Sequence, residues 1–61
     1  MDASLVRAAH AQGLAVRAFT VNDVGEMRRL LACGVDALIT DVPDVARSAA
    51  GGMAVTLAAA A

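Results

Sequence analysis

The stretch VRAFTVND, Val16 to Asp23, has the pattern of a buried strand that leads into a helix. Apolar residues dominate its first half, and Thr20, Asn22 and Asp23 follow where the strand would end. Asparagine and aspartate side chains accept hydrogen bonds from the free N–H groups of a first helical turn. In α/β folds, ligand sites form at the carboxyl ends of parallel strands. The stretch therefore predicts an α/β fold with a polar rim at these residues.

The sequence on both sides of this stretch predicts further regular elements. Apolar spacing, capping residues and glycines predict helices over 2–12, 22–34 and 43–50, and strands over 14–21 and 37–40. Asn22 is expected to cap the second helix, with Asp23 in its first turn. The segment MAVTLAAAA, residues 53–61, is low in complexity and predicts no regular structure. The expected organisation is one domain part over residues 1–50 and an alanine-rich tail over 51–61.

The predicted helices carry recognisable caps and apolar stripes. Asp2 or Ser4 is expected to cap the first helix, and Gly13 and Gly34 are expected to end the first and second helices. Val35 is expected to fold back on Leu30, as happens in Schellman caps. The apolar positions are Leu5, Val6 and Ala9 in the first helix, and Val24, Met27, Leu30 and Leu31 in the second.

Two segments of the chain are approximate copies of one unit. AQGLAVRAFT and ACGVDALIT each contain a helix end, a glycine and a strand, and their glycines, Gly13 and Gly34, lie 21 positions apart. A strand–helix–strand order requires parallel strands, and parallel sheets are normally covered on both faces. Two strands and three helices cannot supply that cover. We therefore expect this chain to be part of a larger α/β structure.

Length, charge and cysteine content narrow the possible functions. A domain of about 60 residues is marginally stable without a staple, and the single cysteine, Cys33, can form neither an intrachain disulfide nor a thiolate cluster. A lone thiol fits a reducing compartment better than an oxidising one. The net charge is −1 and the five arginines are scattered, so no nucleic-acid partner is expected. The longest apolar run, 53–61, is too short to span a bilayer, and the beginning of the chain predicts no signal peptide.

The segments LVRAAHAQGLAVRAFTVND and GEMRRLLACGVDALITDVPD resemble the C-terminal end of the glycerophosphodiester phosphodiesterase family. The likeness covers residues 5–46. It implies that the chain holds the last two βα units of a TIM (β/α)8 barrel, with residues 1–50 as the C-terminal part of that domain. The matching residues are Gly13, Leu14, Val16, Thr20, Val21, Asn22, Met27, Leu30, Gly34, Val35, Asp36, Ile39, Thr40, Asp41 and Pro43.

The resemblance also implies an activity for the parent enzyme. Such an enzyme hydrolyses glycerophosphodiesters to glycerol 3-phosphate and an alcohol, with two histidines as acid and base and with carboxylates that hold Mg²⁺ or Ca²⁺. The His-Arg-Gly motif and the glutamate motif that carry this chemistry are not in the sequence. We therefore expect no catalytic residue, no metal ligand and no activity in this chain alone. The family pattern has tryptophan where this chain has Phe19, and the resemblance implies that Phe19 is a wall of the substrate pocket.

Other residues with reactive side chains have structural interpretations. His10 lies near a helix C-terminus and Cys33 lies beside a helix-ending glycine, so both are expected to be structural. Asp41 is expected to be a turn and capping residue before Pro43, although a metal or phosphate role is conceivable. Asp36 precedes its strand and therefore belongs to the end of the fold that serves stability.

Arg17 shares strand parity with Phe19. If both side chains faced a barrel interior, the guanidinium of Arg17 would need a partner that this chain does not supply. A contact between Arg17 and a substrate phosphate is therefore left open.

Two other functions remain open at the level of sequence. The chain could be a small α/β module that self-associates or docks on a partner through its exposed strand edges and apolar tail. It could also come from another phosphate-binding α/β barrel, but the segments after the two strands, VND and VPD, lack the expected glycines. In each case we expect the rest of a barrel, or self-association, to supply the missing stability.

Overall fold

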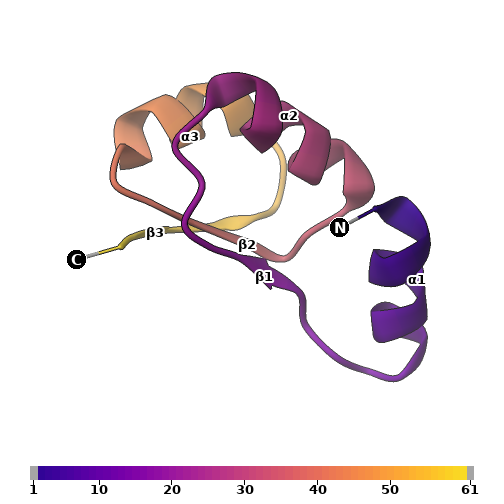
Figure 1. Ribbon diagram of the computed structural model, residues 1–61. Coiled ribbons are helices and arrows are strands. Elements are labelled where there is room, and N and C mark those ends of the chain that lie inside the picture. The colour runs from indigo at the N-terminus through magenta and orange to yellow at the C-terminus, as the bar shows by residue number, and fades with distance from the viewer. Residues whose placement is uncertain (1, 61) are drawn as a thin grey trace.

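Helices and strands alternate along the chain, which confirms the predicted α/β class (Figure 1). The computed structural model describes residues 2–60, so Ala61, the last residue of the predicted tail, lies outside the described residues. Within residues 2–60 the elements are α1 (Ala3–Ala11), β1 (Arg17–Ala18), α2 (Val24–Cys33), β2 (Ala37–Thr40), α3 (Pro43–Ala50) and β3 (Thr56–Ala59).

The strands form a parallel sheet in chain order, β1-β2-β3. Arg17 is in register with Ala37, and Ala37 with Thr56. The next row of the sheet, on the other face, pairs Leu38 with Leu57. The prediction of parallel strands is therefore confirmed, with β2 in the centre of the sheet.

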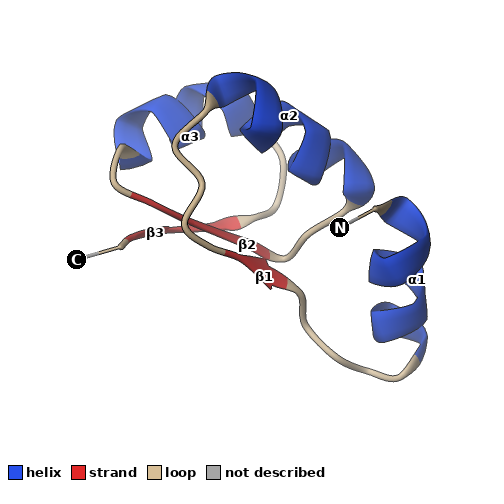
Figure 2. Ribbon diagram, viewed as in Figure 1, coloured by secondary structure: helices blue, strands red, loops and turns tan. Residues whose placement is uncertain are grey.

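Helices α2 and α3 lie on one face of the sheet, and α1 lies beside the end where the strands begin (Figure 2). The core between the sheet and these helices is made of small and medium apolar side chains. Its buried members are Val6, Ala18, Val21, Met27, Leu30, Leu31, Val35, Leu38, Ala46 and Ala50.

The ends of α1 and α2 follow the predicted capping chemistry. The Asp2 carboxylate accepts a hydrogen bond from the Leu5 N–H at 2.9 Å, so Asp2 is the N-cap of α1. Gly34 has φ of +92°, a left-handed conformation that glycine adopts without a Cβ clash. The Val35 N–H then donates to the Leu30 carbonyl at 3.4 Å, which confirms the predicted Schellman arrangement.

The start of α2 differs from the prediction. Asp23, and not Asn22, is the N-cap, and its carboxylate accepts from the Glu26 N–H at 2.8 Å. Both residue types cap helices well, so local sequence did not distinguish them. Asn22 is unavailable for capping because its side chain accepts hydrogen bonds from Thr40, the last residue of β2, and from Asp41, which follows it.

Two predicted segments have different extents in the structure. The first strand, expected over 14–21, is reduced to Arg17–Ala18. At its start, the Val16 carbonyl accepts from both the Asp36 and Ala37 N–H groups, and regular pairing begins only after it. The tail, expected to lack regular structure, contains β3. This expectation was wrong because the pairing depends on the exposed backbone edge of β2 and not on side-chain pattern.

The apolar face of α1 is narrower than the sequence predicted. Val6 is buried and contributes to the core, but the side chain of Leu5 is 56% exposed. Figure 1 shows why: α1 lies beside the end of the sheet and not over its face, so only part of its surface meets the rest of the molecule. In α2, by contrast, Met27, Leu30 and Leu31 are buried as predicted.

Candidate functional site

The carboxyl ends of β1 and β2 are joined by the side chain of Asn22. Its Oδ1 accepts hydrogen bonds from the Thr40 hydroxyl at 3.0 Å and from the Asp41 N–H at 2.8 Å. Its Nδ2 donates to the Asp41 carboxylate at 2.9 Å. We call these three residues the rim clamp. It connects the loop that follows β1 to the loop that follows β2.

Thr40 is the buried member of the rim clamp. Its side chain is fully excluded from solvent, and its hydroxyl both donates to Asn22 and accepts from the Val42 N–H at 3.1 Å. A buried hydroxyl without partners would cost about 1–3 kcal/mol. The network therefore satisfies the hydroxyl and also fixes the first residues before α3.

Asp41 is placed at the rim but does not have the predicted capping role. The N-cap position of α3 belongs to Val42, which makes no side-chain capping hydrogen bond. Pro43 is at the start of this helix, as predicted. The Asp41 side chain is instead oriented by Asn22 and remains accessible to solvent.

Phe19 lies at the carboxyl end of β1, immediately after Ala18, and its side chain is 74% exposed. A phenyl ring is normally among the more buried side chains of a fold. This ring is therefore an apolar surface next to the polar rim. The role of Phe19 as a substrate-pocket wall stays a prediction.

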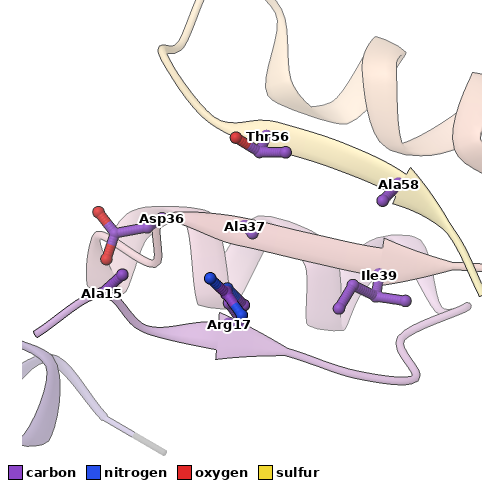
Figure 3. A pocket seen from close by; sticks show the side chains of 7 residues that line it. All are labelled: Ala15, Arg17, Asp36, Ala37, Ile39, Thr56 and Ala58. Carbon is purple, nitrogen blue, oxygen red and sulfur yellow. The ribbon is translucent and has the colours of Figure 1, made fainter.

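A hollow of about 430 Å³ lies on the sheet (Figure 3). Arg17 stands in it, and none of the hydrogen bonds or ion pairs among residues 2–60 involves the Arg17 side chain. The guanidinium is thus available to an anion, and a contact between Arg17 and a substrate phosphate stays a prediction. The lining residues are Ala15, Arg17, Asp36, Ala37, Ile39, Thr56 and Ala58.

The opposite end of the sheet is held by Asp36. Its Oδ2 accepts hydrogen bonds from the Val16 N–H at 2.6 Å and from His10 Nε2 at 2.8 Å. These contacts lower the pKa of Asp36, the bond from Val16 most and the bond from His10 next. His10 thus connects the end of α1 to the start of β2, at the end of the sheet remote from the rim.

These contacts predict a pH dependence of stability. Because the folded-state pKa of Asp36 is lowered, its contribution is fully present above the ordinary carboxyl pKa of about 4 and is lost as the pH falls through the lower folded value. We expect Asp36→Asn to lower the melting temperature at pH 7. As the pH is lowered, the melting temperature of this variant should fall less steeply than that of the wild type. The matched control is Asp44→Asn. The Asp44 side chain is 95% exposed, and its carboxylate lies 3.6 Å from the Arg47 guanidinium. Equal acid profiles for wild type and Asp36→Asn would contradict the assignment.

The remaining reactive groups do not gather into a site. Cys33 is half-buried at the end of α2, with a free thiol. No three of the described His, Cys, Asp and Glu side chains are arranged to hold a metal ion. Within residues 2–60, no helix is long and apolar enough to cross a membrane.

The rim clamp is the feature that sequence reasoning missed. The sequence predicts a separate role for each member: Asn22 as a cap, Thr40 as a strand end and Asp41 as a turn residue. Their positions held a usable signal, because polar residues that directly follow two neighbouring parallel strands meet at one edge of the sheet. What the sequence lacked was the path of the chain after β1, which brings Asn22 within hydrogen-bonding distance of Thr40 and Asp41.

Comparison with known proteins identifies the family of this chain. No curated protein and no solved structure gives a significant match. The model of the glycerophosphoryl diester phosphodiesterase family, however, matches residues 1–45 of the 61. This range includes Phe19 and the whole rim clamp, and it ends within α3, before β3 begins. The chain belongs to the glycerophosphoryl diester phosphodiesterase family.

Proposed function

We propose that this chain is the C-terminal part of a glycerophosphodiester phosphodiesterase barrel, over about residues 1–50. The parent enzyme hydrolyses glycerophosphodiesters to glycerol 3-phosphate and an alcohol. The present chain supplies the rim of the substrate pocket and none of the reacting groups. By itself it is inactive.

The arrangement of sheet and helices supports the barrel. The strands follow chain order, and α2 and α3 lie on the same face of the sheet (Figure 2). A doubly wound sheet reverses its strand order and places helices on both faces, whereas a barrel adds each strand beside the previous one and keeps all its helices outside. The hollow with Arg17 and Ile39 then corresponds to the barrel interior. This one-sided, sequential winding, in a chain of this family, is the observation that carries the proposal.

The rim residues have defined roles in this proposal. Phe19 offers an exposed ring to the alcohol or glycerol part of the substrate. Asn22 holds the loops after β1 and β2 in one arrangement through its contacts with Thr40 and Asp41. A pocket wall whose loops are held in place loses less conformational freedom when a substrate binds.

The divalent metal implied by the family does not fit the residues described here. Asp23 caps α2 and Asp41 is bonded to Asn22. Among residues 2–60 no group of three potential ligands faces a common point. The proposal therefore assigns the metal ligands and the acid and base to other strands of the parent, and no step is assigned to them here.

The proposal is tested on the native gene product. An antibody against residues 24–36 should capture a protein of about 27 kDa, the size of a whole barrel of roughly 250 residues. That protein should release glycerol 3-phosphate from glycerophosphocholine with Mg²⁺ or Ca²⁺, and Phe19→Ala should raise KM several-fold. Exposed Leu5→Ala is the matched control and should leave KM unchanged. A captured species near 6.1 kDa, or a whole barrel without this activity, would overturn the proposal.

A further inference from the structure

The sheet has unused pairing capacity on both sides. Within the described residues, β1 and β3 each pair only with β2. Since the Thr56 and Ala60 N–H groups donate to the Asp36 and Thr40 carbonyls, strand alternation turns the N–H of Ala59 to the outer edge of β3. Unpaired edges of this kind are templates for a further strand.

The face that carries the hollow has large side chains on one side and small ones on the other (Figure 3). Arg17 stands on β1 and Ile39 on β2, whereas β3 offers only Thr56 and Ala58. The hollow therefore lies where a bulky group from elsewhere can enter. Such a surface is complementary to itself if its large side is brought over its small side.

We propose that two copies of the 61-residue chain associate about a two-fold axis parallel to the strands. In this arrangement β1 of one copy lies beside β3 of the other, all strands stay parallel, and the hollow faces inward. Arg17 of one copy enters the space over Thr56 and Ala58 of the partner subunit. A two-fold operation uses both edges of both copies, so the assembly closes at a dimer and does not extend into a fibre.

The charges on this face agree with the proposed pairing. An axis parallel to the strands keeps the beginnings of all strands at one end. Arg17 and Asp36 both line the hollow there, so the dimer places guanidinium and carboxylate groups of different copies at the same end. Arg17 has no ion pair or hydrogen bond among residues 2–60 that this would break. The chain's net charge of −1 gives little repulsion between copies.

A stable dimer of this kind buries about a fifth of the exposed surface of each copy. The chain exposes 3802 Å², and a stable interface buries about 800 Å² of each partner, which is about a fifth of that surface. The open face and the edges of β1 and β3 together form a continuous surface for this purpose. This association concerns the 61-residue chain produced alone and requires no phosphodiesterase activity.

The test is sedimentation of the purified 61-residue chain over a range of concentrations. We expect a folded species of twice 6.1 kDa. Ala58→Glu adds a charge to the hollow and should raise the dimer dissociation constant at least tenfold. The matched control, Ser48→Glu, adds the same charge to the exposed surface of α3 and should change the dimer dissociation constant less than twofold.

A second variant tests the strand edge separately. Ala59→Pro removes an N–H from the outer edge of β3, where proline is tolerated in edge strands. Circular dichroism should therefore show a folded chain, and sedimentation should show a monomer. A monomeric wild type, whether folded or unfolded, would overturn the proposal. So would an open-ended series of oligomers, a dimer that neither variant weakens, or one that Ser48→Glu weakens equally.

Discussion

Replacement of Leu38 by alanine is expected to unfold this chain. Leu38 lies on the central strand β2, is fully excluded from solvent and belongs to the core under α2 and α3. Truncation of a buried leucine to alanine typically costs about 2–5 kcal/mol. A core in a chain of this size rarely supplies more than about 3–5 kcal/mol. The loss therefore equals most or all of the available stability.

The measurement is urea denaturation followed by far-ultraviolet circular dichroism, at one protein concentration because association would add to the apparent stability. The control is Leu14→Ala, which removes the same atoms from a side chain that is 60% exposed. We expect the control to stay within about 0.5 kcal/mol of wild type. An unfolding midpoint of Leu38→Ala close to that of the control would show that β2 is not the centre of the core.

Loss of the rim clamp is expected to have the second largest effect. Asn22→Ala removes the acceptor of the Thr40 hydroxyl and the Asp41 N–H, and also the donor to the Asp41 carboxylate. Because Thr40 is buried, its hydroxyl loses a partner that water replaces poorly. The expected cost is about 1–3 kcal/mol in the free energy of unfolding.

The variant Asn22→Asp separates the contributions within the clamp. It keeps an oxygen for Thr40 but replaces the donor to Asp41 by a second carboxylate, so the two like charges repel at pH 7. Protonation relieves this repulsion, so the deficit relative to wild type should shrink between pH 7 and pH 4. The deficit of Asn22→Ala, which has no charge, should persist. A pH-independent deficit for Asn22→Asp would show that the bond to Asp41 is not formed in solution.

Local sequence was sufficient for the features that short-range physics determines. The class of the fold, the helix stripe of Met27, Leu30 and Leu31, and the glycine that ends α2 were all predicted and confirmed. Each depends on residues within about one or two turns of the chain, whose spacing and capping groups are readable in order. The family was also readable, because its motifs lie in one continuous stretch.

The candidate site depended on contacts between distant segments. Which of Asn22 and Asp23 caps α2 was decided by tertiary contacts, which engage Asn22 with residues 18 and 19 positions away. The exposure of Leu5 was decided by the position of α1 beside the sheet and not over it.

The sequence alone thus determined the α/β class, the helices and the family of this protein. The tertiary structure alone decided the rim clamp, the Asp36 contacts and the strand β3. The physical reason is that these hydrogen bonds join backbone and side-chain groups that lie far apart in the sequence. Which of these groups meet is decided by the packing of the whole sheet against its helices, and not by the order of residues within one element.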